Sequence, residues 1–138
     1  MQISFTAPPN APGILMPLLP IIFTIDGSTT SDSVALVDSG STINVLPYSL
    51  GVSIGAVWEE QSTEMQLTGS LSQFEARGLF VYVSIPSVTQ DYFVRLTWAW
   101  TKAELTRPIL GQIDFFDKFD VCFFRSDSVF DLTWKNNP

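Results

Sequence analysis

Apolar and polar residues alternate over short runs along most of the chain, which is the period-two pattern of β-strands with one buried face. Between residues 79 and 85 the pattern is strict, because Leu79, Val81, Val83 and Ile85 all fall on one side. Proline and glycine residues interrupt the runs and favour tight turns between them. The pattern predicts strands over residues 21–25, 33–37, 42–46, 64–67, 71–77, 79–85, 92–100, 121–124 and 129–132.

Helical spacing is confined to one segment near the C-terminal end. Ile113, Phe116 and Phe119 recur every three residues, which predicts a short helix within residues 112–119. Residues 1–17 are rich in proline and predict an extended lead-in. The rest predicts one all-β domain over residues 18–134, with one short C-terminal helix, and a tail over residues 135–138.

Composition supports a packed β domain and excludes several kinds of chemistry. Hydrophobic residues make up 46% of the chain and charged residues 15%, which argues against disorder, and the 11 Phe favour strands. The net charge of −7 predicts no nucleic-acid partner, since phosphate repels a negative surface. The chain has no histidine, so Ser-His and Cys-His catalysis are excluded for this chain alone. The single cysteine, Cys122, lies in an apolar run, which predicts a buried structural thiol.

Two other groups of side chains have plain structural interpretations. Asp114, Asp117 and Asp120 lie close together in the sequence, but they lack the glycine and the closing glutamate of a calcium loop. They predict a solvated acidic face, with no metal and no cofactor. Trp98 and Trp100 share one face of a predicted strand, which predicts packing in the core or at an interface.

The chain shows no targeting or membrane-spanning signal. Residues 11–25 are strongly apolar, but they are too few to span a bilayer and include three prolines. No basic residue precedes Arg77, so the basic region that begins a secretory signal is missing. These observations predict no membrane span and a cytoplasmic protein, unless the sequence is a domain cut from a longer one.

The most informative motif is an aspartate directly after an apolar strand, followed by serine and glycine. Asp38 follows Val37 in this way, and an ionised carboxylate at the end of a buried strand needs either partners or a function. Gly40 lets the chain turn and leaves backbone N–H groups to face the carboxylate, while Ser39 and Ser41 add hydroxyl donors nearby. Taken alone, an Asp-Ser-Gly sequence at a strand end is more often a turn than an active site.

Two further features of the sequence change the interpretation of this motif. Ile109, Leu110 and Gly111 lead into the predicted helix, and a turn at residues 68–72 lies between two alternating strands. In this order the three features resemble the retropepsin-like aspartic peptidases, over residues 18–132 or so. The resemblance implies a closed β-barrel of the acid-protease type, which forms half of the working enzyme and carries a flap hairpin.

The resemblance also implies roles for individual residues. Asp38 is expected to be the catalytic aspartate. The other expected site residues are an active-site loop of Ser39, Gly40 and Ser41, a flap tip of Thr68, Gly69, Ser70 and Leu71, a supporting segment of Ile109, Leu110 and Gly111, and a substrate pocket lined by Ile43 and Val45.

Only one such aspartate is present, because Asp26, Asp32 and Asp127 do not complete the pattern. The resemblance therefore implies a homodimer in which two copies of Asp38 activate a water molecule that hydrolyses a peptide or protein substrate. Two departures from the family pattern are the single glycine at the flap tip and the hairpin expected after the helix. They leave open an inactive module that keeps the fold for dimerisation or peptide binding. A β-sandwich binding domain unrelated to peptidases is the third interpretation.

Overall fold

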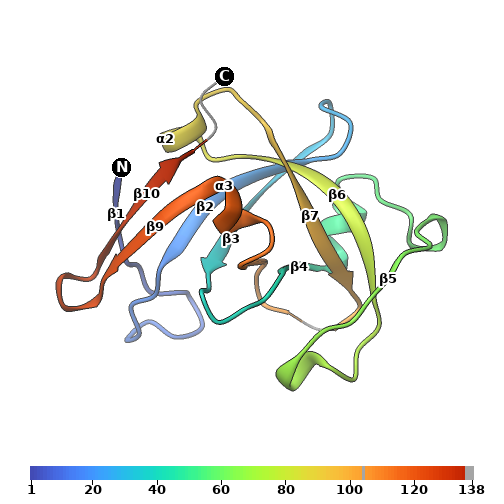
Figure 1. Cartoon of the computed structure of the whole chain (residues 1–138), viewed down its shortest axis with the longest axis horizontal. Helices are drawn as coiled ribbons and strands as arrows, with labels where there is room; N and C mark the ends of the chain where they lie inside the picture. The colour runs from blue at the N-terminus through green and yellow to red at the C-terminus, as the bar shows by residue number, and fades with distance from the viewer. Residues whose placement is uncertain (104, 136–138) are drawn as a thin grey trace.

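The computed structural model describes residues 1–103 and 105–135 and is built mainly from strands (Figure 1). The larger sheet has the order β2-β3-β8-β4-β7-β6-β5. Its strands are β2 (Leu18–Thr24), β3 (Thr30–Val37), β4 (Asn44–Pro47), β5 (Glu64–Met65), β6 (Ala76–Ser84), β7 (Val94–Thr101) and β8 (Ile109–Leu110). Because β2 also pairs with β6, the strands from β2 round to β6 close into a barrel, with β5 outside the ring. The predicted all-β fold with a closed barrel is confirmed.

The barrel closes where β2 meets β6. Phe23 on β2 lies opposite Val83 on β6, and its ring packs edge-on against Trp98, with 5.4 Å between ring centroids. All three side chains are completely buried. The strict alternation along β6 thus marks the residues that fill the barrel, since Leu79 and Val81 on the same face are buried as well.

A second, smaller sheet packs beside the barrel. It consists of β1 (Gln2–Ser4), β10 (Val129–Trp134) and β9 (Phe119–Phe124), in that order, and all its pairs are antiparallel. The hairpin of β9 and β10 confirms the two strands predicted near the C-terminal end. Phe130 lies in this sheet and its ring packs at a tilt against that of Phe5, with 6.0 Å between ring centroids, so the sheet shares the main core.

The helices are all short. They are α1 (Tyr48–Ser53), α2 (Pro86–Thr89) and α3 (Phe115–Lys118), with 3-10 turns at Trp58–Glu60, Gly69–Leu71 and Arg125–Asp127. The predicted C-terminal helix is confirmed by α3. The sequence pattern missed α1 and α2, because a helix of six residues or fewer is shorter than the window in which helical spacing can be recognised. No helix in the described part of the chain is long and apolar enough to cross a membrane.

Two detailed predictions are wrong and a third is confirmed. Residues 71–75 were predicted as the start of a strand, but β6 begins only at Ala76. Cys122 was predicted to be buried, yet it is exposed, because its side chain lies on the outer face of β9. Trp98 and Trp100 are completely buried, as the interpretation of core packing predicted.

The barrel seam can be tested through Phe23. Phe23→Leu removes the edge-on ring contact with Trp98 and leaves a small cavity, so we expect the free energy of unfolding to fall by about 1 to 2 kcal/mol. Phe93→Leu, at a side chain that is 41% exposed, is the matched control and should change it by less than about 0.5 kcal/mol. Urea titrations measure both values, and equal effects would contradict the assignment of Phe23 to the seam.

Candidate active site

Asp38 lies directly after β3, at the point where β3 pairs in parallel with β8. Val37 is opposite Leu110 in this pairing, and the Asp38 N–H donates to the Leu110 carbonyl oxygen at 2.9 Å. The Ser41 N–H donates to the Asp38 carbonyl oxygen at 3.1 Å, which closes a turn after the strand. The backbone on both sides of Asp38 is therefore fixed by hydrogen bonds, and its side chain follows the buried C-terminal end of β3, where Ala35 and Val37 are buried.

The Asp38 carboxylate has one backbone donor. The Gly40 N–H donates to Asp38 Oδ1 at 2.9 Å, as the Asp-Ser-Gly sequence predicted. The hydroxyl of Ser41 behaves differently from the expectation, because it donates to the Ile43 carbonyl oxygen at 2.7 Å and so stiffens the loop. Ser39 is exposed beside the carboxylate. The second carboxylate oxygen is left available to a ligand.

Gly111 lies directly behind this loop, where there is no room for a side chain. A Cβ atom on Gly111 would be 2.3 Å from the Ile43 carbonyl oxygen and 2.8 Å from that of Ser41. The next two residues bind the loop, since Gln112 N–H donates to the Ser41 carbonyl oxygen and Ile113 N–H to that of Thr42, both at 2.9 Å. The segment after β8 thus acts as a support for the loop.

A buried asparagine that the sequence analysis missed joins this support to the barrel. Asn44 is completely buried, and its Oδ1 accepts the Gly111 N–H at 2.8 Å. Its Nδ2 donates to the Thr97 carbonyl oxygen and to Asp114 Oδ1, both at 3.0 Å. A polar residue within the apolar run of β4 was the signal that the sequence offered, because a buried amide needs partners for all its groups.

The position of Asp114 corrects the prediction of a solvated acidic face. Only 19% of its side chain is exposed, and it accepts the Thr97 N–H at 3.1 Å as well as the amide of Asn44. Lys118, one turn along α3, forms an ion pair with it at 3.3 Å. Asp117 and Asp120 are exposed, as predicted. In residues 1–103 and 105–135, no group of three or more acidic or cysteine side chains is placed to hold a metal ion.

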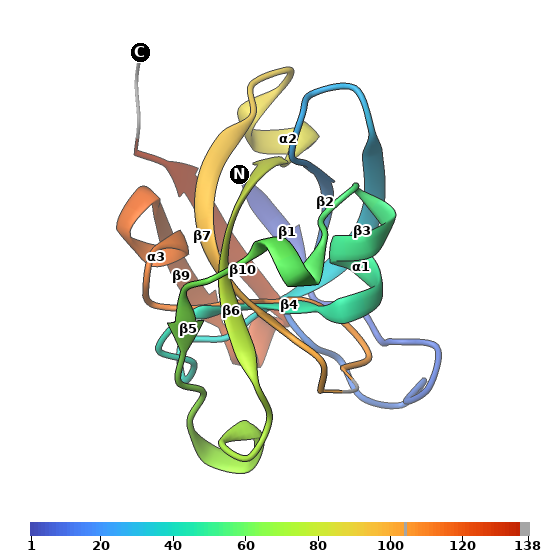
Figure 2. The same cartoon turned by 90° about the vertical axis from the view of Figure 1, so that its right-hand side faces the viewer.

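The predicted flap is a loop that projects beyond the barrel at the ends of β5 and β6, as Figure 2 shows. Glu64 pairs with Arg77, Met65 pairs with Ala76, and the loop runs between these pairs. Its two arms are tied together by Gln66 Nε2, which donates to the Ser72 carbonyl oxygen at 3.3 Å.

The flap is held down by a leucine that the sequence analysis did not single out. Leu67 is 2% exposed and packs in a cluster with Val45, Ala76 and Ala99, while Leu71 packs against the same cluster from the flap tip. The flap therefore rests on the floor of the site through an apolar contact.

Most of the predicted residues border one pocket of about 250 Å³ between the active-site loop and the flap. The residues that the sequence predicted and that line it are Asp38, Gly40, Ser41, Ile43, Val45, Thr68, Gly69, Ser70, Leu71 and Ile109. Leu110 and Gly111 are buried behind the loop, and Ser39 lies outside this lining. Thr42 and Leu67 complete the wall and were missed. Asp38 is the one acid among the described residues of the lining, and it lies there beside apolar side chains such as Ile43 and Val45.

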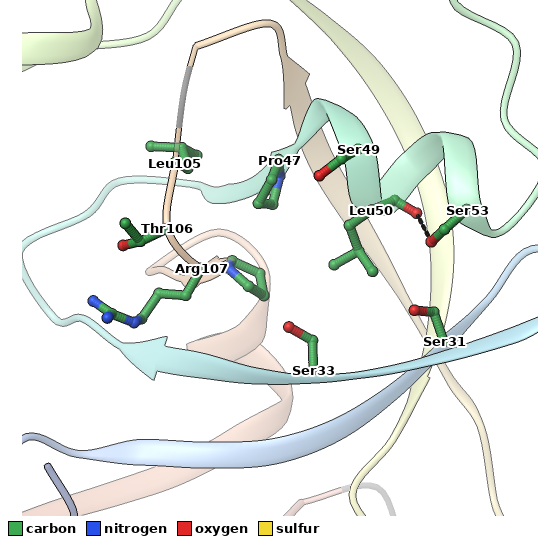
Figure 3. A pocket seen from close by; sticks show the side chains of 10 residues that line it. Ser31, Ser33, Pro47, Ser49, Leu50, Ser53, Leu105, Thr106 and Arg107 are labelled. Carbon is green, nitrogen blue, oxygen red and sulfur yellow. Dashed lines mark hydrogen bonds between the residues drawn. The ribbon is translucent and has the colours of Figure 1, made fainter. Parts of the chain in front are cut away.

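A second pocket, of about 280 Å³, lies between β3, α1 and the segment before β8 (Figure 3). Its described lining holds the hydroxyls of Ser31, Ser33, Ser49 and Ser53 but no carboxylate. Arg107 borders it, yet in Figure 3 the side chain extends away from Ser53, and its guanidinium donates to Asn10 Oδ1 at 3.3 Å. The described lining of this pocket therefore includes no carboxylate that could act in hydrolysis.

Comparisons with known proteins identify the architecture. The chain superposes on a retropepsin-like aspartic protease from Rickettsia conorii with a TM-score of 0.65 and 11% identity, over 96% of this chain and 91% of that one. The chain has the retropepsin-like fold. The same fold relates it to the retroviral protease-like domain of Ddi1 from Leishmania major, with a TM-score of 0.58 and 14% identity over 88% and 91% of the two chains. The EIAV protease matches with a TM-score of 0.50 and 14% identity, over 74% and 86%.

Comparisons of the amino-acid sequence alone do not identify the retropepsin-like fold. No protein-family model matches the chain, and no curated protein matches it. At 11 to 14% identity the solved structures establish the fold alone.

The support behind the loop can be tested through Asn44. Asn44→Asp keeps the shape but replaces the amide donor with an acceptor that faces Asp114 Oδ1 and the Thr97 carbonyl oxygen. We expect the free energy of unfolding to fall by about 2 kcal/mol or more at neutral pH, because a buried acceptor is left opposite two others. Asn10→Asp makes the same change at an exposed residue and should have little effect. Denaturant titrations of both variants give the comparison.

Proposed function

We propose that the chain is an aspartic endopeptidase that works as a homodimer, with one Asp38 supplied by each copy. The observation that carries the proposal is the position of Asp38, which follows the buried end of β3, is held by backbone hydrogen bonds and borders a pocket between the active-site loop and the flap. Likeness to solved aspartic proteases across nearly the whole chain supports it. A second acid must come from elsewhere, because Asp38 is the only acid in the described lining of the pocket.

In this proposal the two carboxylates divide the work of a general acid and a general base. Like charges a few ångströms apart cannot both be ionised, so the pair holds one proton between them. The ionised carboxylate takes a proton from a bound water molecule, whose oxygen attacks the carbonyl carbon of the scissile peptide bond. The protonated carboxylate polarises the carbonyl oxygen, and a proton is then delivered to the leaving nitrogen. No covalent bond to the protein forms at any step.

The walls of the pocket indicate the substrate class. Ile43, Val45, Leu67, Leu71 and Ile109 present apolar groups around Asp38. An extended peptide with an apolar side chain next to the scissile bond buries that side chain against these walls, which favours its binding. The flap excludes bulk water from the reacting groups once the peptide is in place.

Asp38→Asn tests the chemistry, because an amide can neither take up nor supply the proton. We expect kcat on an extended apolar peptide to fall at least about 100-fold, with the fold and the dimer unchanged. Asp32→Asn is the control, since it makes the same change in charge at an exposed residue of β3 and should leave kcat unaltered. Peptide cleavage followed by mass spectrometry measures the rates. Full activity of Asp38→Asn would rule out the proposed mechanism.

The shared proton also predicts the pH dependence. Activity requires one ionised and one protonated carboxylate, so kcat/KM should rise and then fall as the pair passes from two protons to none. The limits of this bell belong to the pair, and Asp32→Asn should not move them. Rates measured between pH 3 and about pH 8 give the profile. A rate that only increases toward alkaline pH would argue for a different base.

A module that binds peptides without cleaving them is the second candidate. It is favoured by the docked flap, because Leu67 is buried in the floor of the site and restricts entry to it. The two candidates differ in one measurement. Binding of a peptide by the purified dimer, with no product at any pH at which it is folded, would support the module and exclude the peptidase.

A further inference from the structure

Most of β3 lies at an open edge within the larger sheet. The strand has eight residues, but its pairing with β8 is limited to Leu36 and Val37. In the described part of the chain, residues 30–35 have no strand on that side, because β2 lies on the other side. A strand with one unpaired side is a template on which another strand can form hydrogen bonds.

Two hydrogen bonds determine which groups of β3 face the open side. The Leu36 N–H donates to the Pro108 carbonyl oxygen at 2.9 Å, on the side of β8. The Val37 N–H donates to the Pro17 carbonyl oxygen at 3.0 Å, on the side of β2. Because peptide groups alternate between the two sides of a strand, the even positions turn their N–H and carbonyl groups toward the open side. These positions are Thr30, Asp32 and Val34, to which residues 1–103 and 105–135 supply no backbone partner there.

The sequence of β2 agrees with this assignment. Pro20 of β2 lies opposite Val34, and proline has no N–H to donate. A proline is accepted in a strand where no N–H is needed, so it fits a pair whose members turn their peptide groups away from each other. Val34 therefore directs its N–H away from β2.

The pocket between β3, α1 and the segment before β8 lies along this open side. Its volume is about 280 Å³, and Figure 3 shows the side chains of Ser31 and Ser33 pointing from β3 into it. The hydroxyl of Ser53 donates to the Leu50 carbonyl oxygen at 2.7 Å, whereas the hydroxyls of Ser31 and Ser33 have no hydrogen-bond partner among the described residues. The described lining shares no residue with the pocket beside Asp38, so this is a separate site.

We propose that this edge and pocket bind an extended peptide in which short hydroxyl side chains alternate with basic ones. The peptide adds to β3 as an antiparallel strand, which is the arrangement that β2 has on the other side. Its backbone pairs with the even positions of residues 30–34, and its hydroxyl side chains enter the pocket. The inference does not depend on the proposed function, because the site includes neither Asp38 nor the flap.

The pocket determines which side chains face it. Side chains along a strand alternate between the two faces of a sheet, so the peptide residue opposite Asp32 lies on the outer face and its two neighbours lie on the face of Ser31 and Ser33. A threonine suits these two places. Its hydroxyl bonds with the serine hydroxyls, which otherwise lack partners, while its methyl group packs against Pro47 and Leu50.

The charge of Asp32 decides between a basic peptide and a second copy of the chain. Asp32 is exposed, and no ion pair among the described residues involves it. In the longest symmetric pairing of this edge with itself, the two-fold axis passes through residue 32 and sets the two Asp32 side chains against each other. Like charges directly opposite destabilise a strand pair, and each chain has a net charge of −7. A lysine or arginine at that place has the opposite effect, which favours the basic peptide.

Amide hydrogen exchange, followed residue by residue in NMR spectra, locates the peptide. The probe is a capped hexapeptide of alternating threonine and lysine. We expect exchange to slow at least about tenfold at the even positions of residues 30–34, which gain partners, and to change little at the odd positions, which already face β2. Unchanged exchange at residues 30–34 would overturn the inference, and so would protection confined to Gly40 and Gly69 beside Asp38.

Two methylated peptides test the hydrogen bonds without a change of charge. In the antiparallel pair, the lysine opposite Asp32 turns its N–H toward β3, whereas the threonines turn theirs away. Methylation of the lysine amides should therefore raise the dissociation constant at least about tenfold, and methylation of the threonine amides should raise it much less. Equal constants for the two peptides would overturn the addition of a strand.

A peptide of opposite charge tests the choice of partner. A hexapeptide of alternating threonine and glutamate should bind at least about tenfold more weakly than the lysine probe, because its acidic residue lies opposite Asp32. Equal binding of the two would overturn the preference for a basic peptide.

Val34→Pro tests the edge from the side of the protein. Proline removes the N–H that faces the open side and removes no hydrogen bond to β2, so the chain should still fold. The dissociation constant of the lysine probe should rise at least about tenfold, whereas Val34→Thr, which keeps the N–H, should leave it within about twofold. Denaturant titrations check the folding of both variants, and equal constants would overturn the inference. If Val34→Pro does not fold, the methylated peptides give the same test with the parent chain.

The result is distinguishable from that for the proposed peptidase. Asp38→Asn should bind the probe like the parent, since Asp38 lies outside the site. A parent chain that protects residues 30–34 but cleaves no peptide would count against the peptidase alone. Apolar peptides lack the basic residue that Asp32 attracts, so Asp32→Asn stays neutral toward their cleavage. A chain that cleaves them but leaves residues 30–34 unprotected by the probe would overturn this inference alone.

Discussion

The position of Asp38 depends on the close contact between Gly111 and the loop that follows β3. Carbonyl oxygens of Ser41 and Ile43 fill the space that a side chain at Gly111 would need, and the peptide groups beyond Gly111 bind the same loop. A carboxylate at a strand end would otherwise be free to adopt many orientations. The contact restricts those orientations before any ligand arrives, which is what a preorganised site requires.

The contact is itself held from behind by buried polar groups. Asn44 connects Gly111 with Thr97 on β7 and with Asp114 beside α3, so three separate segments meet at one amide. Polar networks of this kind are costly to bury unless every member has a partner. Here the partners are present, and the network joins the barrel, the active-site loop and the helix that leads into β9.

The sequence carried enough information for the architecture and for the centre of the site. Alternation identified most strands of the barrel, and Asp38 with Gly111 indicated which strand ends meet. Elements of six residues or fewer, such as α1, remained invisible because no periodic pattern fits within them. Asn44 was overlooked since its role comes from partners far away in the chain. Cys122 was wrongly predicted to be buried, because the residues beside it in the sequence are apolar. An apolar run does not indicate which face of an edge strand is covered.

For the proposed function, Leu67 has a consequence for which peptides the pocket would accept. Leu67 belongs to the flap loop, and its burial against Val45, Ala76 and Ala99 stabilises the docked position of that loop by roughly 2 kcal/mol, the usual contribution of a leucine side chain withdrawn from water. The position of the loop in which Leu67 is undocked is then populated by roughly one molecule in thirty. If a ligand can enter only when Leu67 is undocked, the apparent affinity of the pocket for that ligand is weakened by the same factor. Long peptides that contact the whole groove can offset this loss, whereas dipeptides and tripeptides cannot. In the proposed peptidase, the docked flap loop would thus discriminate against short peptides by an energetic threshold rather than by shape.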